Sequence, residues 1–331
     1  MPRFSTGRRS WRRRAGRGGR AAQASGAAAA PRLGAGTGLR RHRAVVQCLM
    51  GAGGLRGTIT VLVENDAARD DLGAEHGLSL WIETTNGNVL FDTGASGLFA
   101  ENAENLGIDL SAADAVVLSH GHYDHAGGLS YALDRTSAPL YVGKDATMPK
   151  RKRGPEGLCD IGCDSTVVND FANRDSGSGL SLVTGLQKIL PGIAVLPAVP
   201  MDEAAPADNG RLLRERDGKI EQDPFDDELS LLLNGRDHVV VVTGCSHRGI
   251  ANIVAAARQA YTGPASVPWQ IVGGFHLSHE NEDRVRSIGR ALSDVAELRA
   301  GHCTGAEAFG ILAEMLPGRV GPIPAGASWR F

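Results

Sequence analysis

The chain has 331 residues, of which 42% are hydrophobic and 22% charged, which suits one large globular domain or two small ones. No apolar run approaches the length of a membrane-spanning helix, so we expect no membrane segment. The net charge of −2 hides an asymmetry, because residues 1–57 hold 13 Arg and no acid, while all 37 acidic residues follow them. The acidic body is therefore a poor candidate for binding nucleic acid.

The N-terminal tail, residues 1–57, is rich in Arg, Gly and Ala and lacks aliphatic periodicity. We expect it to be disordered and to precede one folded domain over residues 58–331. It has three interpretations. It is an unstructured tail or the product of a start codon assigned too far upstream, an Arg-rich targeting segment, or an arm that binds nucleic acid. Arg8-Arg9 and Arg12–Arg14 hint at a twin-arginine signal, but no convincing apolar stretch follows.

The five cysteines, Cys48, Cys159, Cys163, Cys245 and Cys303, are odd in number and too sparse for a disulfide scaffold. This favours a reducing compartment, and we expect a cytoplasmic protein. Cys159 and Cys163 could pair or bind metal, although two free thiols in a loop is the plainer interpretation.

The first half of the body predicts strands at Thr58–Val63, Leu78–Glu83, Asn88–Phe91, Ala115–Leu118 and Pro139–Val142, with a helix over Ser96–Leu106. Asn86-Gly87 is a strong hairpin signal between the second and third strands. His76 lies in the loop before the second strand, and we hold it as a residue that lines a substrate pocket or an exposed turn.

A metal-binding motif follows the strand Ala115–Leu118. Within six residues, His120, His122, Asp124 and His125 present three imidazoles and one carboxylate, and Gly127-Gly128 places them on a turn. These four groups cannot all surround one ion. His120 and His122 can bind one ion while Asp124 and His125 bind a neighbour, if distant residues complete both sites. Imidazole and carboxylate suit Zn²⁺, and also Mn²⁺ or Fe.

Residues Lys144–Gly179 are polar and Gly-rich, and a long loop of this kind is usually functional or mobile. We expect a lid over the active site, with Lys144 or the basic run Lys150–Arg153 meeting an anionic substrate group. A solvated charged loop is the favoured interpretation of Lys150–Arg153.

The second half predicts strands at Ile193–Val199, Leu229–Leu233, Val239–Val242 and Gln270–Val272, and helices at Gly249–Ala260, Glu282–Leu298 and Ala306–Leu316. Three more histidines, His247, His276 and His302, lie just after predicted strands or at the equivalent point before the last helix. We expect His247 and His302 to be metal ligands, and His276 to touch either metal or substrate.

The motifs SHGHYDHAGGL, GTITVLVEND, NVLFDTG, VVVVTGCSHRGIANIV, IVGGFHL and GHCTG resemble, in this order, the dihydropteroate-synthase-like branch of the metallo-β-lactamase fold superfamily. That branch includes the 7,8-dihydropterin-6-methyl-4-(β-D-ribofuranosyl)aminobenzene-5′-phosphate synthases. The resemblance spans about Thr58 to the C-terminus and implies a four-layer αββα sandwich. It also implies that Asp92 lies beneath the metal site and orients a ligand histidine.

The chain departs from the common ligand set of that superfamily. No histidine occurs between His125 and His238, and Cys245 stands where many relatives carry a bridging Asp. Two alternatives remain for the missing ligand: His247 replaces it, or Cys245 is itself a ligand, with Asp227 or Glu228 as weaker carboxylate candidates.

Two functions follow as expectations. The first is a metal-dependent hydrolase that attacks a small, anionic ester or phosphoester through hydroxide generated at two Zn²⁺ ions, with Asp124 also orienting the nucleophile. The second is a pterin-transferring synthase that releases pyrophosphate. A metal-binding module without turnover is the remaining alternative. The partner is a small-molecule substrate, and the oligomeric state stays open.

Overall fold

The computed structural model describes residues 54–173, 179–201 and 205–331. The expectations for the tail fall almost wholly on residues outside these ranges. Leu55, three residues before the predicted domain start, is buried and donates its backbone N–H to Asn234 O at 2.7 Å. The described fold thus already includes residues at the end of the predicted tail.

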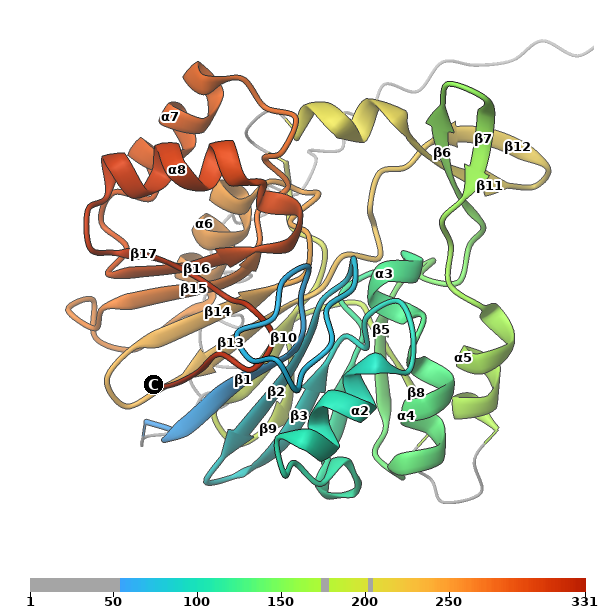
Figure 1. The fold of residues 1–331 in the computed structure, drawn as a ribbon, viewed down its shortest axis with the longest axis horizontal. Helices are drawn as coiled ribbons and strands as arrows, with labels where there is room; N and C mark the ends of the chain where they lie inside the picture. The colour runs from blue at the N-terminus through green and yellow to red at the C-terminus, as the bar shows by residue number, and fades with distance from the viewer. Residues whose placement is uncertain (1–53, 174–178, 202–204) are drawn as a thin grey trace, which may run out of the picture. The chain divides into compact units, whose positions relative to one another are not determined.

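Two seven-stranded sheets form the centre of the fold (Figure 1). The first has, in spatial order, β18 (Ser328–Arg330), β1 (Gly57–Val63), β2 (Ser79–Thr84), β3 (Gly87–Phe91), β4 (Ala115–Val117), β5 (Leu140–Gly143) and β8 (Leu180–Val183). The second has β17 (Val320–Pro322), β16 (Glu297–Gly301), β15 (Trp269–Gly274), β14 (Val239–Thr243), β13 (Ser230–Asn234), β10 (Ile193–Leu196) and β9 (Gln187–Leu190).

Helices cover the outer faces of both sheets (Figure 1). The first sheet carries α2 (Leu98–Asn105), α4 (Leu129–Arg135) and α5 (Ser165–Ala172), with η1 (Leu110–Ala112) beside them. The second carries α6 (Ile250–Ala260), α7 (Glu282–Ala291) and α8 (Ala306–Met315). The short α3 (Tyr123–Ala126), η2 (Ala207–Arg211) and η3 (His302–Thr304) lie in loops at strand ends. This arrangement confirms the predicted α/β sandwich.

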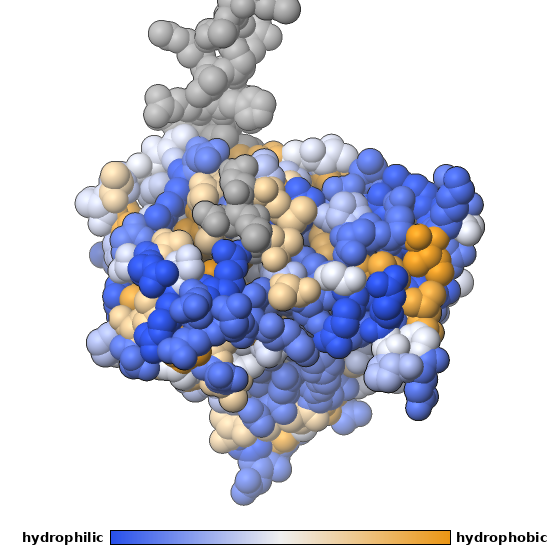
Figure 2. All heavy atoms as spheres, turned by 90° about the horizontal axis from the view of Figure 1, so that it is seen from above, coloured by the Kyte–Doolittle hydropathy of each residue, from blue (hydrophilic) through white to orange (hydrophobic). Residues whose placement is uncertain are grey.

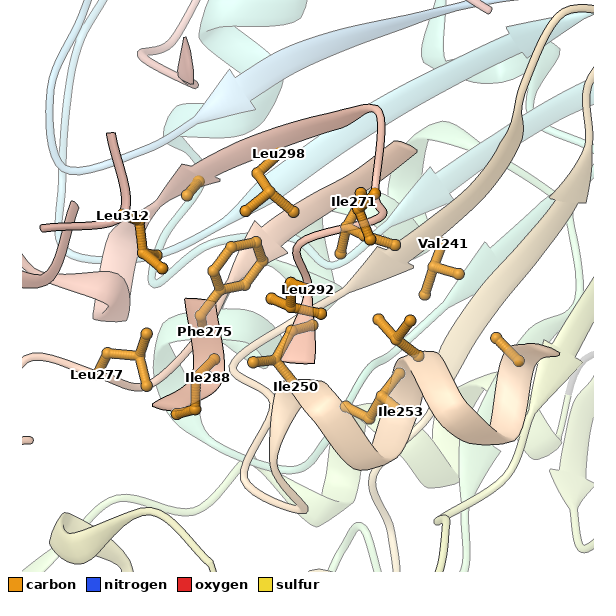
Figure 3. Close-up of a cluster of buried hydrophobic side chains, with 14 of the residues drawn as sticks. Val241, Ile250, Ile253, Ile271, Phe275, Leu277, Ile288, Leu292, Leu298 and Leu312 are labelled. Carbon is orange, nitrogen blue, oxygen red and sulfur yellow. The ribbon is translucent and has the colours of Figure 1, made fainter. Parts of the chain in front are cut away.

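The four consecutive valines of β14, Val239–Val242, contact both neighbouring layers of the sandwich. Val240 and Val242 pack between the two sheets, whereas Val239 and Val241 face the helices of the second sheet. A central strand is buried on both faces, so both alternating sets are apolar. Figure 3 shows Val241 in the helix-facing cluster with Ile250 and Ile253 of α6.

The predicted helix Glu282–Leu298 is too long. The helix ends at Ala291, and Leu298 belongs to β16, where it pairs with Ile271 of the neighbouring parallel strand. Apolar spacing continued past the end of the helix, because a short buried strand and a helical face give similar patterns over a few residues.

The expectation that Lys144–Gly179 is a long loop is also wrong, whereas its role as a lid over the active site stays a prediction. This segment contains α5 and the hairpin β6 (Lys150–Gly154) and β7 (Gly157–Asp160). The hairpin joins β11 (Leu212–Arg216) and β12 (Lys219–Gln222) in a small four-stranded sheet. Oppositely charged side chains face each other across its strands, as Arg151 and Glu215 do at 3.6 Å. A search for alternating hydrophobic residues does not detect strands of this kind.

Among the described residues no helix has the length and apolar character needed to cross a bilayer. The face seen in Figure 2, turned 90° from the view of Figure 1, is mainly hydrophilic, with only small hydrophobic patches.

Candidate metal centre

Strand ends from both sheets converge at one edge of the sandwich. β3, β4, β5 and β8 are parallel in the first sheet, and β14, β15, β16 and β17 are parallel in the second. Loops after parallel strands emerge at the same edge, where α/β proteins commonly bind ligands. The segment His120–His125 follows β4, while His247, His276 and His302 follow β14, β15 and β16.

One group of imidazoles contains His120, His122 and His247. His120 Nε2 lies 3.0 Å from His122 Nδ1, and the His247 ring centroid lies 4.8 Å from that of His120 and 4.9 Å from that of His122. All three side chains are buried. Three imidazoles gathered in this way match a three-histidine site for a divalent ion.

A second group contains Asp124, His125 and His302. His302 Nε2 lies 3.2 Å from His125 Nε2 and 3.4 Å from Asp124 Oδ2, and His125 Nε2 lies 3.9 Å from the same carboxylate oxygen. The two groups adjoin, because the ring centroids of His120 and His125 are 4.3 Å apart. The structure thus places His120 and His122 in one group and Asp124 and His125 in the other, and the binding of an ion by each pair stays a prediction.

The outer ring nitrogens have partners that fix which nitrogen faces inward. Nδ1 of His125 lies 2.7 Å from Asp92 Oδ2, Nδ1 of His120 lies 2.9 Å from Ser119 Oγ, and Nδ1 of His247 lies 3.0 Å from Asn209 Oδ1. Nδ1 of His302 contacts Asn65 Oδ1 at 3.2 Å. When Nδ1 carries the hydrogen, Nε2 keeps a free lone pair, which is the arrangement that metal-binding histidines use.

Asp92 therefore lies where the resemblance implied, against the outer nitrogen of His125. Asn65 and Asn209 were not anticipated, since each is a single polar residue in a loop with no local pattern. Ser119 was not anticipated either, although its position directly before the histidine motif could have suggested a contact with His120.

Burial and charge explain the protonation of the site. Burial and the neighbouring imidazoles His125 and His122 hold the pKa of His120 well below its ordinary range. Burial opposes a charge on His125 as well, but Asp92 and Asp124 outweigh it and raise its pKa to about 9. The two carboxylates thus favour positive charge at this point, and a cation or a proton can supply it.

The residues present fit a pair of divalent ions. Nε2 of His247, the nitrogen opposite the one beside Asn209, is buried without a hydrogen-bond partner. Unpaired buried polar atoms are costly, so they point to a partner that completes the site. The donors are imidazoles and one carboxylate, which suits borderline ions such as Zn²⁺.

Asp227 and Glu228, the weaker carboxylate candidates, bind backbone N–H groups. Gly121 N, between His120 and His122, donates to Asp227 Oδ2 at 2.8 Å. His247 N and Arg248 N donate to the two oxygens of Glu228 at 2.5 and 2.8 Å. These neighbouring carboxylates therefore hold the two histidine loops in place.

Lys150 holds Asp227 in turn. Its ammonium lies 3.0 Å from Asp227 Oδ1 and 2.7 Å from Asp223 Oδ2, and its side chain is only 2% exposed. The expectation that Lys150 is a solvated loop residue is wrong, because two buried carboxylates take it into the interior. Burial lowers its pKa and these carboxylates raise it, with a net raised pKa.

Cys245 lies beside both groups, with Sγ 3.2 Å from His125 Nε2. Cys245 joins His120 and His247 in one set of close ligand atoms, and His125 and His302 in another. His276 packs against His247, with ring centroids 4.3 Å apart, and a ring nitrogen of His276 lies close to the sulfurs of Cys245 and Cys303. Cys303 was not anticipated, although it directly follows His302 in GHCTG.

A cavity of about 360 Å³ opens onto these residues. Four members of the two groups line it, His122, Asp124, His247 and His302, and so do His76, Tyr123, Lys152, Asp208 and His279. His76 lies 3.3 Å from Asp124 Oδ2, which agrees with its expected place at the pocket. Lys144 is exposed and is not part of this lining, whereas Lys152 of β6 is.

The sandwich with histidines at one edge defines a metallo-β-lactamase fold. A family model of the metallo-β-lactamase superfamily matches residues 72–162. The crystal structure of Tm1679, described as a metal-dependent hydrolase of the β-lactamase superfamily, is 30% identical, with a TM-score of 0.70 over 82% of this chain and 98% of that one. The chain belongs to the metallo-β-lactamase superfamily.

Two proteins of Methanocaldococcus jannaschii are also similar. An uncharacterized protein is 30% identical over 271 residues, covering 80% of this chain and 98% of that protein. The 7,8-dihydropterin-6-methyl-4-(β-D-ribofuranosyl)-aminobenzene-5′-phosphate synthase is 28% identical over 256 residues, covering 73% of this chain and 85% of the synthase. The resemblance within the superfamily thus extends to a pterin synthase.

Proposed function

We propose that the chain is a metal-dependent hydrolase with a small, anionic ester or phosphoester substrate. The observation that carries this proposal is the pair of adjoining groups, His120 with His122 and His247, and Asp124 with His125 and His302. Each would hold one Zn²⁺ ion, with Mn²⁺ or Fe as alternatives. A bound pair of such ions supplies Lewis acidity and makes water a stronger acid.

The protein groups then position and deprotonate the attacking water. Although burial opposes ionisation, His125 and His302 hold the pKa of Asp124 below its ordinary range, so it stays a carboxylate that can accept a hydrogen bond from water. His76, 3.3 Å from Asp124, is more exposed and has its pKa lowered by burial and by His302. A neutral His76 could carry the proton from the site to solvent.

The substrate would enter the cavity that Lys152, His279 and Asp208 line. The ammonium of Lys152 lies 3.7 Å from Asp208 Oδ2, and the lysine side chain is 41% exposed. It is therefore available to an anionic group of the substrate, in the role that we had expected of Lys144. The limited volume of this cavity, about 360 Å³, favours a small substrate.

The test is hydrolysis by metal-loaded protein of a panel containing bis-p-nitrophenyl phosphate, p-nitrophenyl phosphate, p-nitrophenyl acetate and simple lactones. We expect metal-dependent cleavage of at least one compound, abolished in His120→Ala and Asp124→Ala. His238→Ala is the matched control, because His238 follows the β13–β14 turn and is not part of either group. Fully loaded protein that cleaves none of the panel would contradict the proposal.

The second function that we propose is pterin transfer, and the 28% identity over 85% of the pterin synthase supports it. Here the metal pair would bind the pyrophosphate of a dihydropterin diphosphate while ribofuranosylaminobenzene phosphate displaces it. Incubation with these two compounds and assay of pyrophosphate tests this directly. Pyrophosphate release that needs both compounds would favour transfer over hydrolysis, and absence of both activities would leave a metal-binding module without turnover.

A further inference from the structure

Two thiols and one imidazole gather outside the two groups already described. Cys245 Sγ, a ring nitrogen of His276 and Cys303 Sγ all lie within 4.8 Å of one another. Cys245 follows β14, His276 follows β15 and Cys303 lies just after β16, so three adjacent parallel strands deliver them to the same edge. All three line the cavity of about 360 Å³.

The ring of His276 packs against that of His247, with centroids 4.3 Å apart, and its Nε2 lies 3.9 Å from Asp208 Oδ2. Both ring nitrogens are buried without a hydrogen bond, and the side chain is only 11% exposed. Its backbone has φ 51°, a left-handed conformation that is costly for a residue other than glycine. An unsatisfied imidazole on a strained backbone is a feature of binding sites, since a ligand can repay both costs.

The backbone around Cys303 makes room for its sulfur. A Cβ on Gly274 would lie 2.6 Å from Cys303 Sγ, so only glycine there allows the close approach. His276 N donates to Cys303 Sγ at 3.3 Å, which fixes the sulfur beside the imidazole. Cys245 is 3% exposed, and its Sγ also lies near His125.

We propose that Cys245, His276 and Cys303 bind an additional thiophilic divalent cation, such as Zn²⁺, beside the pair held by the two groups. Two thiolates and one imidazole form a known type of three-ligand zinc site, with a fourth position open to the cavity. Binding releases the two thiol protons to solvent, and the two thiolate charges balance the dication. Cys245 would be shared between this ion and its neighbour. The site does not depend on which reaction the chain catalyses.

Cadmium binding tests the site, because Cd²⁺ is thiophilic and gives an ultraviolet charge-transfer absorption when thiolates bind it. The full chain is kept reduced with a phosphine, stripped with a chelator, loaded with Cd²⁺ and freed of excess by gel filtration. We expect Cys303→Ser to bind one ion fewer per chain than the unaltered protein and to lose a large part of the thiolate absorption. Cys159→Ser is the matched control, since Cys159 is exposed on β7, and it should change neither value.

A second measurement needs no variant. Iodoacetamide labelling, mapped by mass spectrometry, should modify Cys303 in the stripped protein and spare it after loading, while Cys159 is modified in both. The proposal is overturned if Cys303→Ser binds as many ions with the same absorption, or if loading leaves Cys303 open to alkylation. It is equally overturned if intact mass shows that Cys245 and Cys303 remain joined as a disulfide under phosphine. Circular dichroism checks that Cys303→Ser folds, and Cys303→Ala replaces it if it does not.

Discussion

Asp92 Oδ2 lies 2.7 Å from His125 Nδ1, and both side chains are completely buried. Asp92 also accepts hydrogen bonds from Ser119 N at 2.6 Å and Ser119 Oγ at 2.7 Å, so one carboxylate joins the end of β3 to the loop after β4. Its φ of 57° places it in the left-handed region, which Asp and Asn tolerate better than other side chains. This residue can therefore be changed to Asn without added backbone strain.

Asp92→Asn should lower metal affinity about 10- to 100-fold, which is the usual effect of losing a partner behind a metal-binding imidazole. The amide keeps the shape of the carboxylate but lacks its charge, so it no longer favours Nδ1–H on His125. Zn²⁺ competition with a chromogenic chelator measures the effect. Asp109→Asn, in an exposed cap of η1, should leave affinity unchanged. Equal affinities for all three proteins would exclude this role of Asp92.

Lys150→Met should destabilise the fold by about 3–5 kcal/mol, because it leaves Asp223 and Asp227 buried without their cation. Equilibrium urea denaturation, in protein stripped of metal, measures the free energy of unfolding. Lys219→Met on the exposed strand β12 should stay within about 0.5 kcal/mol of the unaltered chain. A loss at Lys150 no larger than that at Lys219 would show that the buried ion pair contributes nothing measurable.

Two glycine-to-alanine changes should act in opposite directions. A Cβ on Gly121 would lie 1.8 Å from the carbonyl oxygen of Ala146, so the loop between His120 and His122 must shift. Gly121→Ala should cost about 1–3 kcal/mol and weaken metal binding. Gly310, inside α8, has nothing within 4 Å, and Gly310→Ala should stabilise by about 0.5–1 kcal/mol. Thermal unfolding measures the change in stability of both variants, and Zn²⁺ titration measures the change in metal affinity.

Local patterns predicted much of this fold. The alternating and continuous apolar runs at β1 to β4 and β14 identified the central strands, and Asn86-Gly87 identified the β2–β3 hairpin. The dense motif His120–His125 identified the first part of the site, because so many ligand-type residues in so short a span are rarely accidental. Such features depend on neighbours in the sequence, so the sequence alone displays them.

The features of the fold and the site that the sequence did not predict depend on contacts between residues far apart in the chain. The burial of Lys150 depends on Asp223 and Asp227, more than 70 residues away. The small sheet of β6, β7, β11 and β12 forms from polar strands whose pairing leaves no hydrophobic period. Asn209, in the short helix η2, contacts His247 from 38 residues away in the sequence. Each of these partners becomes visible only after the chain has folded.

Zinc should raise the thermal stability of the protein, because His247 Nε2 is buried and unpaired without it. Zn²⁺ at 100 times its dissociation constant adds about 2.7 kcal/mol for one site. For a folded body of this size that corresponds to a rise in Tm of roughly 4–5 °C. Differential scanning calorimetry of stripped and reloaded protein measures the shift. His238→Ala should keep the whole shift, whereas His120→Ala should lose a large part of it, because it removes one ligand of the first group. A shift of equal size in His120→Ala would mean that zinc stabilises the fold from another place.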